Sequence, residues 1–181
     1  MTTREYLYET HETLRRRELI FSVVREPPAP FWSHQLVVLH IARRLIDHVE
    51  AHDLGLVNVA PIDVILDEAA NLVVQPDVLF VSMDRRAIVH EQVWGAPDLV
   101  VEVLSRGTDR DNIEWCGRRE KLELYRRYGV RECWLVDLIE ERVVVMDLAT
   151  DPPVERIASG GQCVRSSVLP DLIVPAFRLL S

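Results

Sequence analysis

The stretch Gly95-Ala-Pro-Asp-Leu-Val-Val-Glu-Val-Leu104 places a carboxylate inside a run of aliphatic and β-branched residues. Such a run predicts a buried β-strand over about 99–105, with a turn before it. Side chains alternate along a strand, so Asp98 and Glu102 share one face. A carboxylate flanked on both sides by apolar residues is rarely idle, which makes Glu102 a candidate functional residue.

Asp98 and Glu102 are four positions apart, which on a straight strand separates their Cβ atoms by roughly 13 Å. That is too far for one ion, unless Asp98 bends in from the preceding turn. A further acid, Asp77, stands at the start of another apolar run, in Gln75-Pro-Asp-Val-Leu-Phe80. Acids gathered at one strand end form an oxygen-rich pocket suited to Mg²⁺ or Mn²⁺. Turn chemistry is the alternative for both Pro-Asp pairs.

The chain contains one lysine, Lys121. Lysine and arginine together number 21, so the other twenty cations are arginines. Residues 115–128 fit a helix at about 100° per residue, and Lys121 falls in the middle of its apolar arc, beside the predicted core residue Tyr125. Burying an unpaired ammonium is costly, so a carboxylate partner is expected. Because an ammonium can also shift its pKa and act on a water, Lys121 is a candidate catalytic residue; a purely structural ion pair with Glu102 is the alternative.

The helix that follows the strand should return Lys121 over the middle of that strand, because about eight helical residues cover ~12 Å. We therefore expect Glu102 to converge with Asp77 or Asp98 to within the reach of a shared ion. The Lys121 ammonium should lie within about 4–6 Å of one of these carboxylates. The acid beside the ammonium should have a lowered pKa, while crowding should raise the pKa of at least one other acid.

Composition bounds the class of protein. The 181 residues, 48% of them apolar, suit a single domain over 1–181 with a sizeable core. No run approaches the ~20 apolar residues of a membrane span, and the first residues lack the apolar core of a signal peptide, so we expect a cytoplasmic protein without membrane contact. The three cysteines predict neither disulfides nor a zinc site. A net charge of −8 argues against a strongly adhesive nucleic-acid binder but allows an enzyme whose carboxylates hold cations.

Periodicity and turn residues predict a mixed α/β domain of the α+β kind, in which one central mixed sheet is flanked by helices. Helices are expected over 3–16, over 33–51 with Ser33 as its cap, and over 109–128 with Gly129 at the C′ position. Strands are expected over 18–25, 56–66, 72–82, 99–105, 131–138, 141–148 and, more weakly, between 154 and 175.

Several of these blocks together resemble the Uma-two family. They are Gln75-Pro-Asp-Val78, Pro97-Asp-Leu-Val-Val-Glu-Val-Leu-Ser105, Lys121-Leu-Glu-Leu-Tyr-Arg-Arg-Tyr-Gly-Val130 and Glu132-Cys-Trp-Leu-Val-Asp137, with Arg17-Glu-Leu-Ile20, Pro30, His34 and Leu169-Pro-Asp-Leu172 outside them. Uma-two proteins are bacterial, are classed as candidate restriction endonucleases and have the PD-(D/E)xK nuclease fold. The resemblance spans nearly the whole chain and implies a restriction-endonuclease-like core.

Carried over to this chain, the resemblance makes Asp77, Asp98 and Glu102 the catalytic acids and the ligands of Mg²⁺ or Mn²⁺. Lys121 would be the catalytic lysine. In the nuclease signature this lysine stands on the strand, two residues after the acid. Here Leu104 has that place, so the resemblance puts the ammonium on the following helix.

Glu18 and His34 also match family positions near the site, without an assigned role. The resemblance implies a Mg²⁺-dependent DNA endonuclease that hydrolyses phosphodiester bonds, with a homodimer as the form suited to cutting two strands. Two other classes stay open. One is a catalytically silent binding or assembly module with a buried Lys121–Glu102 pair. The other is a metal-dependent hydrolase of small phosphoesters, which suits the negative net charge.

Overall fold

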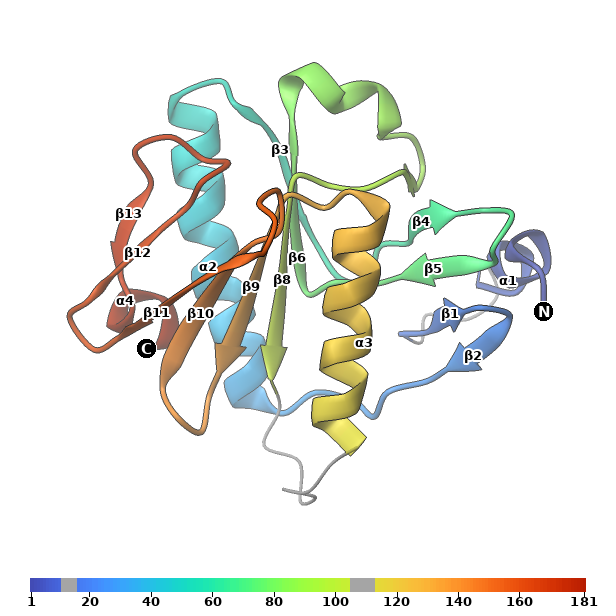
Figure 1. Ribbon diagram of the computed structural model, residues 1–181, viewed down its shortest axis with the longest axis horizontal. Coiled ribbons are helices and arrows are strands. Elements are labelled where there is room, and N and C mark those ends of the chain that lie inside the picture. Colours follow the sequence, from blue (N-terminus) through green and yellow to red (C-terminus); the bar gives the residue numbers. More distant parts are fainter. Residues whose placement is uncertain (11–15, 105–112) are drawn as a thin grey trace.

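The computed structural model of the chain describes residues 1–10, 16–104 and 113–181, with side chains described except at 10 and from 113 to 119. Its centre is a six-stranded sheet in the order β11-β10-β9-β8-β6-β3 (Figure 1). These strands are β3 (Gly55–Val59), β6 (Val78–Ser82), β8 (Leu99–Leu104), β9 (Glu132–Asp137), β10 (Arg142–Asp147) and β11 (Val154–Ser159). All neighbours are antiparallel except β8 and β9, which are parallel.

The parallel pair β8–β9 needs a crossover connection, and α3 (Ile113–Tyr128) supplies it. Gly129 follows the helix with a φ of 93°, as expected for a C′ glycine. The predicted helix is thus confirmed, apart from 109–112, which lie outside the described residues. This crossover places α3 over the face of the sheet next to β8.

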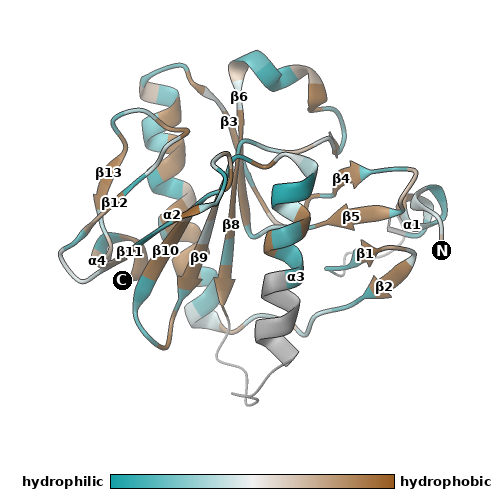
Figure 2. Ribbon diagram, in the orientation of Figure 1, coloured by the Kyte–Doolittle hydropathy of each residue, from teal (hydrophilic) through white to brown (hydrophobic). Residues whose placement is uncertain are grey.

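Residues of β8 alternate between two hydrophobic cores, one on each face of the sheet. Its odd-numbered residues pack with α2 (Trp32–Ala51), whereas Val100 packs with Leu124 and Tyr125 of α3. Glu102 shares the face of Val100, so its carboxylate points toward α3. Figure 1 shows α2 behind the sheet and α3 in front of it, and Figure 2 shows hydrophilic and hydrophobic residues alternating around α2.

Helix α2 begins at Trp32, one residue before the predicted start, and ends at Ala51 as predicted. Phe31 stands at the N-cap and no side chain caps the first turn, so the predicted cap at Ser33 is wrong. His34 lies in that first turn and is buried. The first turn of α2 therefore places the His34 imidazole in the interior of the protein.

A five-stranded sheet lies beside the central one, in the order β2-β1-β5-β4-β7. Its strands are β1 (Glu18–Ile20), β2 (Val23–Arg25), β4 (Val64–Asp67), β5 (Leu72–Val74) and β7 (Val93–Trp94). Helix α1 (Thr3–Thr10) packs on it through Tyr6, and 11–15 lie outside the described residues. The other elements are the 3₁₀ helix η1 (Met83–Ile88), the hairpin of β12 (Cys163–Arg165) and β13 (Ile173–Pro175), and α4 (Phe177–Leu180).

Three predicted strands are each divided in two, and this division produces the second sheet. Residues 18–25 form a hairpin, because Phe21 and Ser22 adopt φ values of 48° and 72°, as in a type I′ turn. The two predicted strands that follow α2 are interrupted around Pro61 and Pro76, since proline has no N–H for the ladder. β4, after the first break, and β5, before the second, pair with each other in the five-stranded sheet, while β3 and β6 pair in the central sheet.

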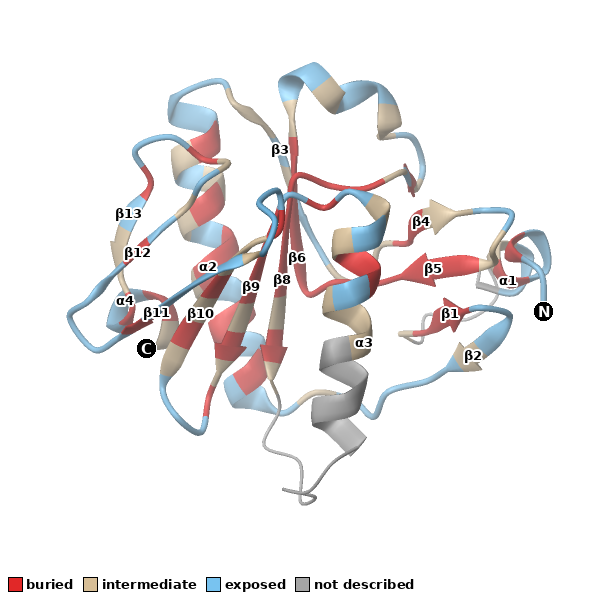
Figure 3. Ribbon diagram, in the orientation of Figure 1, coloured by how far each residue is buried: buried red, intermediate tan, exposed pale blue. Residues whose placement is uncertain are grey.

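Burial follows the same division into layers. Figure 3 shows β6, β8 and β9 in the middle of the central sheet and the inner side of α2 as largely buried, while β11 at the edge of that sheet is largely exposed. The mixed sheet flanked by helices confirms the predicted fold class. None of the helices in the described ranges combines the length and the apolar character that a membrane crossing requires.

Candidate functional site

A cavity of about 550 Å³ opens between β8, α3 and the segment 25–31. Its wall gathers polar side chains that are far apart in the sequence, namely Arg16, Glu18, His34, Asp77, Glu102 and Lys121. Asp77 comes from the junction between β5 and β6, Glu102 from β8, and Lys121 from α3. Two of the predicted acids therefore line one cavity together with the predicted lysine.

Glu102 lies on the α3 side of β8, with 12% of its side chain exposed. Its Oε1 accepts hydrogen bonds from Lys121 Nζ at 3.0 Å and from Tyr125 Oη at 2.5 Å. Burial raises the pKa of Glu102 above its usual value; the Lys121 charge offsets only part of this rise, and the Asp77 charge adds to it. The expected lowering of the pKa beside the ammonium is therefore wrong, because burial outweighs the ammonium.

The Lys121 ammonium points into the cavity, where two carboxylates bind it. Its Nζ lies 2.7 Å from Glu18 Oε1 and 3.0 Å from Glu102 Oε1. Burial disfavours the charge, but Glu102 and Glu18 outweigh burial and raise the pKa of Lys121 above its usual value. The expected inward ammonium with a carboxylate partner is confirmed, and Lys121 keeps its proton at neutral pH.

Asp77 is buried at the junction of the two sheets. Its Oδ2 accepts a 2.7 Å hydrogen bond from the Val103 amide, and His34 Nε2 lies 3.5 Å from the same oxygen. Its Oδ1 accepts a 2.6 Å hydrogen bond from Arg16 Nη1. Burial favours the neutral acid, but the His34 hydrogen bond and the Arg16 charge outweigh burial and lower the pKa of Asp77. Asp77 is thus held as a carboxylate.

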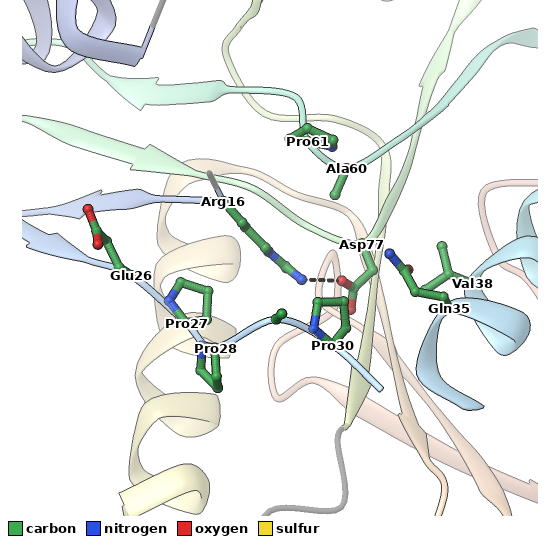
Figure 4. A pocket seen from close by; sticks show the side chains of 11 residues that line it. Arg16, Glu26, Pro27, Pro28, Pro30, Gln35, Val38, Ala60, Pro61 and Asp77 are labelled. Carbon is green, nitrogen blue, oxygen red and sulfur yellow. Dashed lines mark hydrogen bonds and ion pairs between the residues drawn. The ribbon is translucent and has the colours of Figure 1, made fainter. Parts of the chain in front are cut away.

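Arg16 lies between Asp77 and Glu102, the two predicted acids of the cavity. Besides binding Asp77, its Nη2 lies 4.0 Å from Glu102 Oε2 and donates to the Gln75 carbonyl oxygen at 2.6 Å. Figure 4 shows this side chain reaching Asp77, with the proline-rich segment 27–30 alongside. Arg16 is absent from the predicted set because it is one of three successive arginines, and nothing in that run distinguishes it. One protein cation therefore spans the two predicted acids.

Three further side chains join the site without a role assigned from sequence. Tyr125, predicted as core, is 1% exposed and donates to Glu102. The available signal was its spacing of four residues from Lys121, which puts both on one helix face. Glu18 and His34 match family positions. Glu18 contacts Lys121, and His34 contacts Asp77.

Asp98 lies at the opposite end of β8 and does not join this cluster. Its Oδ2 accepts a 2.8 Å hydrogen bond from the Ser82 amide, and its Oδ1 accepts bonds from Arg85 at 3.3 Å and Arg131 at 3.2 Å. Burial opposes ionisation, but these donors outweigh burial and lower the pKa of Asp98. β8 pairs with β9 without a break from Leu99 to Leu104, so Asp98 and Glu102 are separated by an extended segment of roughly 13 Å.

The proline-rich segment 27–30 separates the cavity from a second one of about 510 Å³. Both cavities are lined by Arg16, Asp77 and this segment. The second continues to Gln35, Val38, Ala60 and Pro61 (Figure 4). The Arg16–Asp77 pair therefore borders open space on two sides of the segment.

Within the described ranges, no group of three or more His, Cys, Asp or Glu side chains is arranged to hold a metal ion. The candidate ligands are the two carboxylates Asp77 and Glu102, with the Arg16 guanidinium between them. Carboxylate oxygens are the donors that Mg²⁺ and Mn²⁺ take in proteins. The donor chemistry of the two carboxylates therefore fits a hard cation. The Arg16 guanidinium lies where the two carboxylates stabilise positive charge.

A family model described as "Putative restriction endonuclease" matches residues 4–176 of the chain. The chain belongs to the Uma2 family. Among solved structures, this Uma2 protein is similar to the crystal structure of "a putative nuclease belonging to DUF820 from Anabaena variabilis", with a TM-score of 0.80, 16% sequence identity, and coverage of 99% of this chain and 97% of that chain. At this identity the likeness shows a shared fold. None of the curated proteins compared with the Uma2 chain matches it.

Proposed function

We propose that this Uma2 protein is a metal-dependent endonuclease that hydrolyses phosphodiester bonds of DNA at the cavity between β8 and α3. The observation that carries the proposal is the position of Arg16, whose guanidinium reaches the carboxylates of both Asp77 and Glu102. Two carboxylates that share a protein cation are near enough for small side-chain movements to bring both onto one divalent ion.

Asp77 and Glu102 would hold Mg²⁺ or Mn²⁺, with Arg16 leaving the space between them. Metal ligands must be deprotonated, and Asp77 meets that need because its pKa is lowered. The raised pKa of Glu102 reflects its burial among acids, and a divalent cation beside it would favour the charged form. When bound, the ion lowers the pKa of a water molecule and offsets the charge of the phosphate.

Lys121 serves as a source of positive charge rather than as a base. Its raised pKa keeps it protonated, so it does not accept a proton from water at neutral pH. The ammonium faces the cavity beside Glu102, where it would stabilise negative charge that develops on the phosphate. Tyr125 donates to the same Glu102 oxygen as Lys121 and holds that carboxylate in place.

Asp98 is left out of the proposed ligand set, because its carboxylate is already bound by two arginines and a backbone amide. The proposed ligands are therefore two of the three acids that the family resemblance implies. A homodimer would supply two such sites for cutting both strands of a duplex.

One observation favours a second function. Asp77, Glu102 and Glu18 each already have a protein cation within 3.0 Å, because Asp77 has Arg16 while Glu102 and Glu18 share Lys121. Acids paired with protein cations in this way need no metal for a partner. Such a cluster would suit a catalytically silent binding or assembly module whose buried ion pairs are structural.

Divalent-ion binding separates the two functions. Thermal unfolding of EDTA-treated protein is measured against added Mn²⁺, beside a plasmid-nicking assay. The endonuclease should gain Tm by mass action and nick plasmid only with the metal. A protein that shows no change in Tm and no nicking is the silent module. Hydrolysis of bis(4-nitrophenyl) phosphate without plasmid nicking would instead identify a hydrolase of small phosphoesters.

A further inference from the structure

Two consecutive aromatic side chains stand exposed at the start of α2, the first of them at the candidate cavity. Phe31 is 62% exposed and Trp32 is 83% exposed, and Phe31 lines the cavity that also contains Asp77 and Glu102. Neighbouring exposed aromatic side chains at the rim of a cavity are typical of a binding surface, unlike apolar residues scattered singly over a protein. We call Phe31 and Trp32 the aromatic ledge.

Helix α2 fixes the position of the ledge relative to the acids. Phe31 stands at the N-cap of α2, His34 lies in the first turn, and both line the cavity. His34 Nε2 lies 3.5 Å from Asp77 Oδ2. The ledge therefore begins three residues before a side chain that contacts the acid. Ile41 and its buried neighbours anchor the helix to the sheet, so the ledge has a rigid base.

The charge of the cavity does not by itself favour a nucleic acid. Its lining includes three basic side chains, Arg16, Arg25 and Lys121, and four acidic ones, Glu18, Glu26, Asp77 and Glu102. The whole chain has a net charge of −8. Proteins that hold duplex DNA rely on many lysine and arginine contacts to phosphates. One divalent ion would offset only part of this shortage of positive charge. Affinity for DNA therefore requires an interaction other than charge attraction.

We propose that the aromatic ledge stacks on a nucleobase of the substrate, next to the phosphate bound at the acids, so that the protein acts on single-stranded DNA or on an unpaired segment. The inference rests on the proposed function. An aromatic ring stacks on the face of any base, and that face is open only where the base is unpaired and free of its stacked neighbours. Stacking does not depend on charge and therefore suits an acidic chain.

Binding measurements test the ledge directly. Fluorescence anisotropy is measured with a short labelled oligodeoxythymidine and with a hairpin duplex of matched length, using Ca²⁺ to hold back cleavage. The wild type should prefer the single strand. The Phe31→Ala/Trp32→Ala variant should bind the single strand more weakly by about tenfold or more, with little change for the duplex. Trp32→Phe, which keeps a ring, should retain most of the affinity.

Leu39→Ala is the matched control, because Leu39 is 63% exposed on the same helix but does not line the cavity. It should bind the single strand as the wild type does. Equal single-strand affinity of the double variant and the wild type would overturn the inference. A second result would also overturn the inference, namely a double variant that binds DNA as the wild type does but no longer forms a dimer in sedimentation velocity. The ledge would then be a contact between two copies of the chain.

Cleavage in Mn²⁺ reports separately on the proposed function. A wild type that binds single strands through the ledge but never cleaves them would refute the endonuclease. A wild type that cleaves, together with a double variant that binds and cleaves single strands equally well, would refute the ledge alone.

Discussion

A carboxylate stands at each end of β8, Asp98 just before the strand and the partly buried Glu102 near its end, and the two have opposite surroundings. At the start of the strand, a backbone amide and two arginines bind Asp98, outweigh its burial and lower its pKa. Near the end, Glu102 shares one ammonium with Glu18, lies near Asp77, and has a raised pKa because burial prevails. The start of the strand thus carries a satisfied charge, whereas its end gathers more acid than its neighbouring cations can balance.

The difference does not come from local sequence. Pro76-Asp77 and Pro97-Asp98 each stand before an apolar strand, yet only Asp77 reaches the cavity. Arg16 and His34 bind Asp77, while arginines from η1 and from the turn before β9 bind Asp98. A Pro-Asp motif therefore places an acid at a strand start, and the partners brought by other elements decide its role.

The largest effect should come from Glu102→Gln, which keeps the shape of the side chain but removes the charge that a divalent ion needs. Plasmid nicking should fall by at least about 10²-fold while the circular dichroism spectrum is retained. Glu123→Gln, at an exposed position of α3, is the matched control and should nick as the wild type does. Undiminished nicking by Glu102→Gln would remove this end of β8 from the active site.

Lys121→Met keeps the aliphatic stem and deletes the ammonium that Glu18 and Glu102 share. Nicking should fall on the order of 10²–10⁴-fold. Without metal, the stranded carboxylates should lower the free energy of unfolding by about 3–5 kcal/mol, and with Mg²⁺ by less, because the ion supplies positive charge. Urea melts in both conditions measure this. Equal destabilisation in both, from a wild type that never nicks, would support the silent module.

Arg16→Met removes the protein cation between Asp77 and Glu102. Mn²⁺ should then bind on the order of tenfold more tightly, because the ion no longer competes with the guanidinium. Isothermal titration calorimetry measures this affinity. Arg43→Met, which removes an exposed arginine of α2, is the control and should leave the affinity unchanged. Weaker Mn²⁺ binding by Arg16→Met would mean that Arg16 supports the ion rather than occupying its place.

Asp98→Asn should show the smallest effect on catalysis and a moderate one on stability. The neutral amide binds Arg85 and Arg131 less well, at a cost of about 1–3 kcal/mol in the free energy of unfolding near neutral pH. Nicking by the folded variant should equal that of the wild type. Loss of nicking without loss of stability would return Asp98 to the catalytic set.

Acid and base should act on the two ends of β8 in opposite senses. The lowered pKa of Asp98 gives stability that is present above the unfolded-state value of ~3.9 and is lost as the pH falls through the folded pKa. The raised pKa of Glu102 gives stability that is present below ~4.3 and is lost as the pH rises through its folded pKa. Urea melts across pH measure the free energy of unfolding. Asp98→Asn should reduce the stability lost on acidification, and Glu102→Gln should reduce the stability lost as the pH rises above ~4.3.

The predictable parts of the molecule are those whose signals are local. The apolar run of β8 predicted the strand and the face of the sheet on which Glu102 lies. The position of Lys121 in an apolar helical arc predicted that its side chain points inward from α3. Arg16 was not predictable, because its partner Asp77 lies 61 residues away and its neighbours are also arginines. The hairpin at Phe21 escaped notice because its turn uses neither glycine nor asparagine.

The segment Pro27-Pro28-Ala29-Pro30 bears on how the molecule avoids pairing with other chains. It follows β2, an outer strand of the five-stranded sheet, and an outer strand offers unpaired backbone groups to any extended peptide. Prolines have no N–H to offer, so a ladder started on β2 cannot continue beyond it. Their fixed φ also reduces the chain entropy lost on folding. The partition between the two cavities is therefore also a barrier against aggregation by strand addition.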